Sequence, residues 1–522
     1  MKDISSGVIS LIEKSLTPHD PKDFEEIGTV IGVGDGISKV HGLTNAIFGE
    51  LVSFESGNQG IVMDLDENFV SVVLLDNTIT VVEQEIVKRT GNVFRVPVGE
   101  ELVGRVISPT GNPLDAFGEL EFEDLMPIET IAPGIMDRTP VNEPLETGCT
   151  LIDALIPVGK GQRELLIGNR STGKTVVALN TIIHQKNKDV ICIYVAIGHK
   201  QSDTAKTIHL LQQYDALSYT VVIDASANTT ALEQFLAPYA GCTIGEYFMN
   251  KGKDVLIVYD DLSNHAIAYR ELSLLLRRPP GREAYPGDIF YIHSRLLERA
   301  GRLSKENGGG SLSALPIIQT QSDDITAYIA TNLISITDGQ IFFDTNLFNN
   351  GIRPAINIGF SVSRVGGAAQ TKAMKKVSGS LKLELAQYES LSAFMQFGSE
   401  LDPTSQRAID RGKRAIQLLK QDLHTTYSLT EEVIFLFLLK ENYLDKLDTS
   451  KVNTFSRQFA SYVQEMYPQT FSEIESTKDL SDECATTIRK AADEFIVIFI
   501  KPSDEQATSS KEEKKETPAK QA

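Results

Sequence analysis

The chain has 522 residues, enough for roughly two to four domains with sizeable cores. Apolar residues make up 41% and charged residues 23% of it, which is ordinary for a soluble globular protein. The formal net charge of -20 argues against nucleic acid and anionic lipid as direct partners, because both attract basic surfaces.

The sequence shows no targeting or membrane-spanning segment. No apolar run reaches the length of a membrane span, and the N-terminus lacks the basic start and cleavage site of a secretory signal. The cysteines are scattered without a C-x-x-C pair, so we expect reduced thiols and neither disulfides nor a zinc site. We expect a cytoplasmic protein that reaches the inner face of the cell membrane only through other subunits.

Residues 1–22 are expected to form an N-terminal arm. Apolar residues recur at helical spacing as far as Leu16, and Pro18 and Pro21 end the pattern. This short helix either packs on its own subunit or docks on another one, and the pattern favours neither.

Residues 23–94 have a different character. Short β-rich runs at 29–33, 37–40, 50–54, 60–63 and 70–75 alternate with Gly, Asn and Asp. This spacing predicts a small all-β barrel.

Residues 95–371 are predicted to form an α/β domain, and residues 372–502 a helical bundle. Continuous apolar strands at 190–195, 219–223 and 255–259 are separated by helical stretches, which is typical of a parallel sheet covered on both faces. Beyond them, helices are expected at 372–397, 405–422, 430–444, 452–466 and 481–499. The polar tail at 503–522 is expected to be disordered.

Residues 168–175 read Gly-Asn-Arg-Ser-Thr-Gly-Lys-Thr, a complete G-x-x-x-x-G-K-[ST] phosphate-binding loop. The apolar run 165–167 predicts a strand before it, and 176–179 predict a helix after it. Glycines at both ends let backbone amides face phosphate oxygens, and Lys174 supplies positive charge to the terminal phosphates. The Thr175 hydroxyl is the expected Mg2+ ligand.

Asp260 is the second expected contributor to this site. It ends the predicted strand 255–259, where an acid commonly binds the metal across from the loop threonine, directly or through water. A strand-end aspartate can also simply cap a turn or helix, but the loop upstream favours the metal role.

Arg364 lies in a glycine-flanked turn after a predicted strand at 355–360. One interpretation is a surface salt bridge. The other is an arginine finger that stabilises the phosphoryl-transfer transition state in a neighbouring subunit, on the order of a thousandfold in rate. Spacing alone leaves both interpretations open.

Longer motifs resemble the α subunits of F-type rotary ATP synthases over about residues 28–422. They are GDGI at 34–37, KRTG at 88–91, PGI at 133–135, GQRE at 161–164, YDDL at 259–262, LRRPPGREAYPGD at 276–288, GIRPAIN at 351–357 and SVSRVGGAAQ at 361–370. The resemblance implies a barrel, a nucleotide domain and a helical bundle. It also implies a ring of three α and three β subunits around a central shaft, with the arm at 1–20 a candidate contact for a peripheral stalk.

The resemblance also implies roles for individual residues. The α subunit binds Mg2+ with ATP or ADP without turning it over, while catalysis occurs on β at the α–β interface. Arg364 matches the finger, Ser361 a serine needed for communication between catalytic sites, and Ser335 a further interface residue. The nucleotide is expected on Gly168, Asn169, Arg170, Ser171, Thr172, Gly173, Lys174 and Thr175, with its adenine near Phe348, Arg353, Pro354 and Gln421.

The sequence departs from the family at four positions of the site. Asn169 and Ser171 replace Asp and Gln in the loop, and Leu423 replaces a second adenine-pocket glutamine, so we expect weaker contacts there. His199 replaces Gln, at the position where β holds the glutamate that activates water. A neutral histidine could act as a base, or the site is hydrolytically silent.

Three functions are therefore compared. The first is a nucleotide-binding, non-catalytic α subunit of a rotary ATPase, and the second an F-type-like motor reassigned to another mechanical task such as gliding. The third is a hexameric RNA translocase with a related nucleotide domain. The net charge, the barrel motif at 34–36 and the helical C-terminus count against the third.

Overall fold

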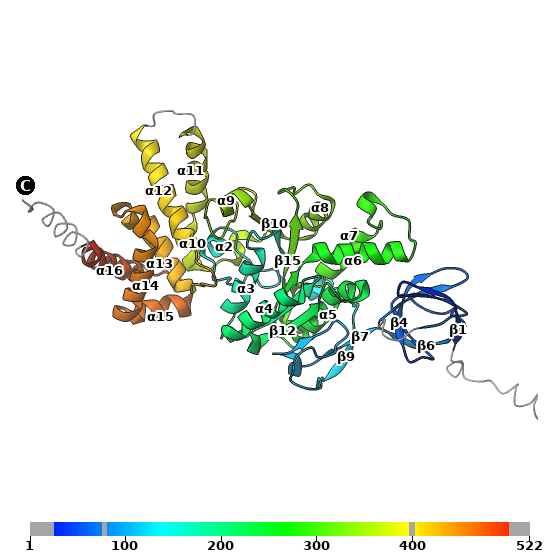
Figure 1. The fold of residues 1–522 in the computed structure, drawn as a ribbon. Helices are drawn as coiled ribbons and strands as arrows, with labels where there is room; N and C mark the ends of the chain where they lie inside the picture. Colours follow the sequence, from blue (N-terminus) through cyan, green and yellow to red (C-terminus); the bar gives the residue numbers. More distant parts are fainter. Residues whose placement is uncertain (1–25, 76–80, 396–401, 501–522) are drawn as a thin grey trace, which may run out of the picture.

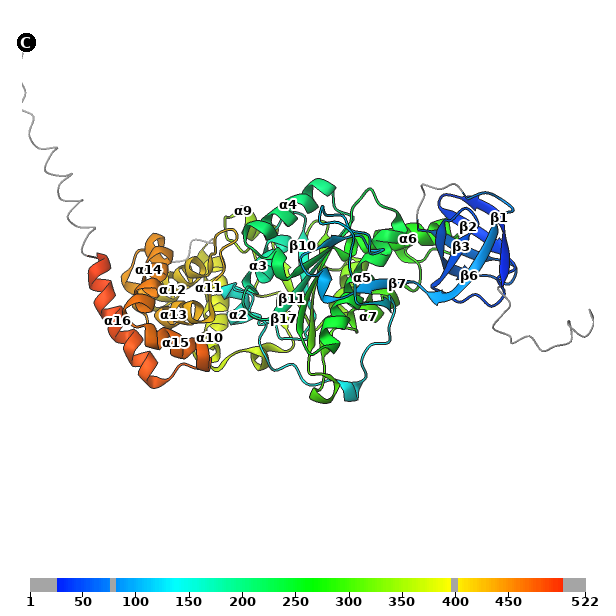
Figure 2. The ribbon, with the colours of Figure 1, turned by 90° about the horizontal axis from the view of Figure 1, so that it is seen from below.

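The computed structural model describes residues 26–75, 81–395 and 402–500, so the predicted N-terminal helix and the polar tail lie outside the described residues. Its three parts follow one another along the molecule (Figures 1 and 2). A β-barrel lies at one end, a sheet covered by helices lies in the middle, and a helical domain lies at the other end. This is the fold class that the sequence predicted.

The barrel closes in the strand order β1-β2-β5-β4-β3-β6, and each neighbouring pair is antiparallel. Its strands are β1 (Ile27–Gly34), β2 (Ile37–His41), β3 (Glu50–Phe54), β4 (Gln59–Leu65), β5 (Val70–Leu74) and β6 (Ile86–Val93). Alternate valines such as Val40, Val52 and Val72 fill the interior, as the period-2 pattern requires. A two-stranded ribbon of β7 (Arg95–Val98) and β9 (Asp124–Pro127) then leads into the middle domain.

The central sheet has the order β17-β16-β10-β15-β13-β11-β12-β8, with β14 beside β15. Apart from β14 and β17, its paired strands are parallel. The strands are β8 (Val106–Ile107), β10 (Glu164–Asn169), β11 (Val190–Ile197), β12 (Thr220–Ala225), β13 (Asp254–Asp260), β14 (Gly301–Arg302), β15 (Ser311–Thr320), β16 (Gly339–Phe343) and β17 (Val362–Ser363).

Helices cover both faces of this sheet, so successive residues of one strand enter two different cores. On β10, Leu166 packs into one core, whereas Leu165 and Ile167 pack into the other. This explains why the strands are continuously apolar in sequence. The helices of this domain are α2 (Thr150–Leu155), α3 (Lys174–His184), α4 (Gln201–Gln213), α5 (Ala231–Asn250), α6 (Leu262–Leu275), α7 (Ile289–Leu297), α8 (Tyr328–Ile336) and α9 (Thr345–Asn349).

The helical domain differs from the prediction in two places. The helix expected at 372–397 is interrupted at Gly379, which has low helix propensity, and a short additional helix begins at Pro468. The helices are α10 (Lys372–Ser378), α11 (Leu381–Met395), α12 (Pro403–Leu419), α13 (Leu429–Lys440), α14 (Val452–Met466), α15 (Pro468–Thr477) and α16 (Asp482–Ile500). Among the described residues, no helix combines the length and apolar character needed to cross a bilayer.

The strand predicted at 355–360 is wrong. Only Ile356 pairs there, in an isolated bridge to Phe343, and the rest of the segment turns. The Asn357 side chain accepts a hydrogen bond from the Gly359 amide at 3.0 Å, and the Ser361 hydroxyl donates to the Asn357 carbonyl at 2.6 Å. Local side-chain bonds of this kind compete with strand pairing.

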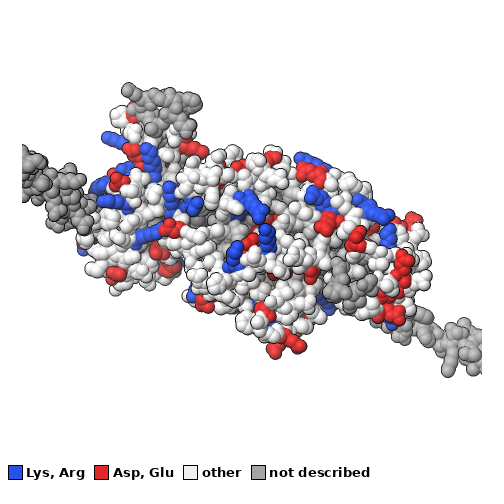
Figure 3. All heavy atoms as spheres, in the orientation of Figure 1, with Lys and Arg blue, Asp and Glu red and all other residues white. Residues whose placement is uncertain are grey.

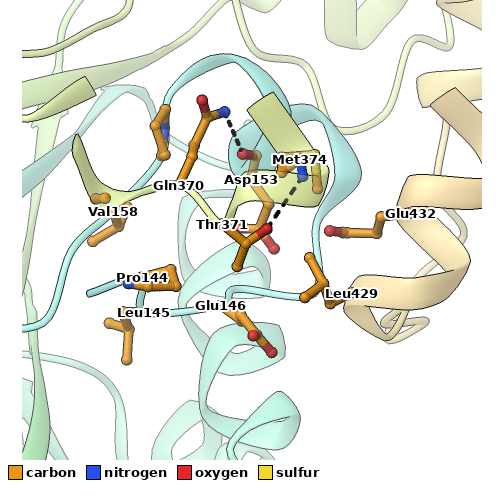
Figure 4. Close-up of a pocket in the computed structure, with 12 residues that line it drawn as sticks. Pro144, Leu145, Glu146, Asp153, Val158, Gln370, Thr371, Met374, Leu429 and Glu432 are labelled. Atoms are coloured by element: carbon orange, nitrogen blue, oxygen red, sulfur yellow. Dashed lines mark hydrogen bonds between the residues drawn. The ribbon is translucent and has the colours of Figure 1, made fainter. Parts of the chain in front are cut away.

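An acidic cluster lies where the helical domain packs on the middle domain (Figure 4). Glu432 of α13 is 1% exposed and lines a small cavity of about 20 Å3 together with Glu146 and Asp153. Figure 4 shows the Glu432 side chain pointing from its helix into this space. Asp153 accepts hydrogen bonds from Thr147 and Gly148, and Glu146 pairs with lysines, whereas Glu432 Oε1 has no hydrogen-bond partner among the described residues.

Candidate nucleotide-binding site

The phosphate-binding loop connects the buried strand β10 to α3, as the sequence predicted. Gly173 caps α3 with φ 102°, a left-handed conformation that favours glycine. A Cβ atom on Gly168 would lie 2.5 Å from the Phe343 carbonyl oxygen, so only glycine fits there. The unpaired amides at the start of α3 therefore form a cradle for an anion.

Lys174 is buried beside this cradle. Its Nζ donates to the carbonyl oxygens of Gly168 at 2.8 Å and Asn169 at 2.5 Å. Burial lowers the pKa of Lys174 to about 8, although the carboxylates of Asp261 and Asp260 oppose this shift. A phosphate at the cradle would add negative charge beside this buried ammonium and favour its charged form.

Thr175 and Asp260 meet at the mouth of the loop. The Thr175 hydroxyl donates to Asp260 Oδ2 at 2.8 Å, and the Tyr194 hydroxyl donates to the same oxygen at 2.9 Å. Adjacent oxygens around an octahedral Mg2+ lie about 3.0 Å apart, since Mg–O bonds are about 2.1 Å. The Thr175 and Asp260 oxygens thus fit the ligand pair that the sequence predicted for Mg2+.

His199 faces the same carboxylate from the neighbouring strand. It follows β11, which pairs with β13 so that Ala196 lies opposite Asp260. His199 Nε2 lies 3.1 Å from Asp260 Oδ1, which is within ion-pair distance. Burial lowers the pKa of His199, but the Asp260 carboxylate outweighs burial and raises it to about 9.

These groups open into a cavity of about 850 Å3, within the range of ligand-sized sites. Residues 170–175 line it together with Phe348, Arg353, Pro354, Gln421 and Leu423. The Arg353 guanidinium lies over the Phe348 ring at 4.7 Å. A cavity that combines a phosphate cradle with an aromatic ring is suited to a nucleotide.

Two predicted contact residues, Asn169 and Gln421, bond to the scaffold around the cavity. Asn169 Nδ2 donates to the Thr345 hydroxyl at 2.9 Å, and its Oδ1 accepts from Thr320 and from the Asp323 amide. The Gln421 amide group donates to the carbonyls of Gly148 at 2.6 Å and Thr425 at 2.8 Å. Both side chains therefore position the backbone of the site.

The three residues expected to act on a neighbour do not line this cavity. Arg364 is exposed and borders a separate hollow of about 370 Å3 with Arg163 and Asp338. Within the part of the protein that the structure describes, no hydrogen bond or ion pair engages its guanidinium. Ser361 is fully buried and accepts from the Phe342 amide at 2.9 Å, whereas Ser335 is exposed near the end of α8.

Family models match all three parts of the protein. Within the ATP synthase alpha/beta family, the model of the beta-barrel domain matches residues 23–91, that of the nucleotide-binding domain matches 148–363, and that of the C-terminal domain matches 370–495. The chain belongs to the ATP synthase alpha/beta family. It is thus a subunit of an ATP synthase or ATPase complex.

Relatives in this family cover almost the whole sequence. It is 53% identical to the ATP synthase subunit alpha of Acetivibrio thermocellus over 94% of this chain and 97% of that protein. It is 52% identical to the ATP synthase subunit alpha of Aquifex aeolicus over 94% of this chain and 98% of that protein. The predicted membership of the α-type branch is confirmed.

Tyr194 is a site residue that sequence reasoning missed. The prediction treated it as one of several apolar residues in a strand, yet its hydroxyl fixes the Asp260 carboxylate. The signal in the sequence was a single tyrosine in a buried, apolar strand. A buried hydroxyl needs a hydrogen-bond partner, so this residue indicated a polar contact nearby.

Proposed function

We propose that the protein is the regulatory, nucleotide-binding α-type subunit of an F-type rotary ATPase, and that its own site binds Mg2+ with ATP or ADP without hydrolysing it. One observation supports the absence of hydrolysis at this site. The side chain beside the Thr175–Asp260 pair is an imidazole, and its Nε2 already faces the Asp260 carboxylate. A general base must instead have a free lone pair directed at the attacking water.

In this proposal the subunit contributes to turnover through Arg364, across an interface with a catalytic β-type subunit. Arg364 is exposed, it does not line the subunit's own cavity, and its guanidinium is unpaired among the described residues, all of which supports this role. An arginine aimed at a neighbour's phosphates stabilises charge that develops in the transition state. Ser361, bonded to β16 close to Arg364, and Ser335 would support that interface.

The assembly that follows from this proposal is a ring of three α-type and three β-type subunits around a central shaft. The arm at 1–20 would contact a peripheral stalk, and the complex would place the protein at the inner face of the cell membrane. The proposed divisions are 1–22, 23–94, 95–371, 372–502 and 503–522. The relatives are synthase α subunits, and nothing in the described fold favours a reassigned motor.

The purified full-length protein tests the silent site directly. Calorimetry with ADP and Mg2+ should show one bound nucleotide per subunit, and phosphate release from ATP should stay at the background rate. Robust turnover by the isolated subunit, abolished by Lys174→Ala, would contradict the proposal. Binding that persists unchanged in Lys174→Ala would instead remove this loop as the binding site.

A further inference from the structure

The nucleotide site contains a nitrogen donor beside its two predicted oxygen ligands. His199, Asp260 and Asp261 place ligand atoms within 4.8 Å of one another. Asp261 is already engaged, because it accepts from the Asn264 amide at 2.8 Å and from Gln319 Nε2 at 2.5 Å. His199 and Asp260 therefore remain as the pair that faces the cavity together with Thr175.

The geometry of this pair fits direct coordination. His199 Nε2 and Asp260 Oδ1 lie 3.1 Å apart, and Nε2 is buried without a hydrogen-bond partner among the described residues. Adjacent donors around an octahedral ion with bonds of about 2.2 Å are separated by about 3.1 Å. The backbone holds the histidine in place, since its carbonyl accepts from the Ala227 amide at 2.8 Å.

We propose that His199 is a metal ligand, and that this site therefore takes a divalent transition-metal ion with its nucleotide in preference to Mg2+. Imidazole nitrogen binds first-row transition ions well, whereas Mg2+ prefers oxygen ligands throughout. The inference rests on the nucleotide site proposed above. Mg2+ can still occupy that site, and the inference concerns which divalent ion binds there more tightly.

The attraction between His199 and Asp260 does not oppose this arrangement. The Asp260 carboxylate attracts a proton to the imidazole, and it attracts a divalent cation in the same way. Once the cation is bound, its charge disfavours protonation of the imidazole. Metal binding would release the imidazole proton to solvent, so that the nitrogen becomes a ligand in place of the ion pair with Asp260.

Pulsed EPR of the full-length protein with ADP and Mn2+ tests the proposal. The protein is labelled with 15N-histidine, so a directly bound imidazole gives 15N hyperfine coupling and the nucleotide gives 31P coupling. We expect both couplings in the unmodified protein, and loss of the 15N coupling alone in His199→Gln. His209→Gln, which changes an exposed residue of α4, should keep both couplings.

A second measurement compares ions. The preference for Mn2+ over Mg2+ in the presence of ADP should fall on the order of tenfold in His199→Gln. A 31P coupling without any 15N coupling, or a 15N coupling that survives His199→Gln, would overturn the proposal and leave the nucleotide site standing. Absence of bound Mn2+ and of 31P coupling would overturn the nucleotide site as well.

Discussion

At the residue scale, the nucleotide site is prepared by side chains that are already bonded within the subunit. Lys174 folds back onto the loop carbonyls, and Asn169 and Gln421 bond to Thr345 and to the Gly148 carbonyl. Such groups hold backbone donors and stacking surfaces in place before a ligand arrives, which lowers the entropy lost on binding.

Lys174→Ala should weaken binding of ADP to the isolated subunit on the order of ten- to a hundredfold, because a charge-assisted hydrogen bond contributes about 1.5–3 kcal/mol. Titration calorimetry measures the change. Lys186→Ala, at an exposed position after α3, is the matched control. Equal affinities of the two variants would show that Lys174 does not contact the phosphates.

Gln421→Ala should lower the affinity for ADP and GDP by the same factor. Its amide group holds the backbone at 148 and 425, so its loss deforms the pocket without removing a contact that distinguishes one base from the other. Parallel titrations with the two nucleotides measure the ratio of affinities. A selective loss of ADP binding would show that Gln421 contacts the adenine and distinguishes it from guanine.

At the element scale, buried charges join the connecting segments to the sheet domain. Arg299, after α7, is 1% exposed and pairs with Glu246 of α5 at 2.7 Å. It also donates to the Ile128 carbonyl, which fixes the segment that follows β9. Such a pair specifies how elements pack more than it adds net stability.

Arg299→Ala should lower the free energy of unfolding of the sheet domain by about 3–5 kcal/mol, because it leaves the Glu246 carboxylate buried and unpaired. Thermal unfolding followed by circular dichroism measures the loss, with exposed Arg407→Ala as control. Replacing both partners, in the double variant Arg299→Met and Glu246→Leu, should restore most of the lost free energy of unfolding. A double variant as unstable as Arg299→Ala would contradict this account.

Glu432→Gln should stabilise the protein at pH 8 by about 1–2 kcal/mol and have little effect near pH 5. Burial, reinforced by Asp153 and Glu146, raises the pKa of Glu432 well above its usual value. A carboxyl with a raised folded-state pKa favours folding at low pH and loses that contribution as pH rises. The neutral amide avoids this loss.

The measurement for Glu432→Gln is the unfolding midpoint between pH 5 and pH 8. Glu465→Gln, on the exposed face of α14, should show no trend with pH. If the unfolding midpoint of Glu432→Gln differed from that of the unmodified protein by the same amount from pH 5 to pH 8, the Glu432 carboxyl would not be the titrating group.

The sequence predicted best those elements whose buried position gives them a distinctive composition. Buried strands such as β11 and β13 are continuously apolar, and the loop motif determined the start of α3. The segment 355–360 was wrongly predicted as a strand because its apolar residues form a turn. Hydrogen bonds of the Asn357 side chain and the Ser361 hydroxyl stabilise that turn. The roles of Tyr194, Asn169 and Gln421 depend on partners far away in sequence, which periodicity does not reveal.

At the scale of the whole molecule, the barrel and the helical domain stand at opposite ends of the sheet domain (Figure 1). Figure 3 shows basic and acidic side chains interspersed on one face, without a continuous basic stripe among the described residues of that face. A nucleic-acid interface would require such a stripe. Arg364 and the subunit's own nucleotide cavity belong to separate hollows, which is the arrangement expected if one subunit binds its own nucleotide and acts on a neighbour's.

The ATPase rate of the assembled complex that carries Arg364→Ala tests this account most directly. We predict that turnover falls on the order of a thousandfold or more, because transition-state charge on the neighbour loses its cation. Binding of ADP to the isolated variant subunit should match that of the unmodified one. A complex that keeps its full rate, or a variant subunit that loses its own nucleotide, would contradict the assignment of Arg364 to a neighbouring site.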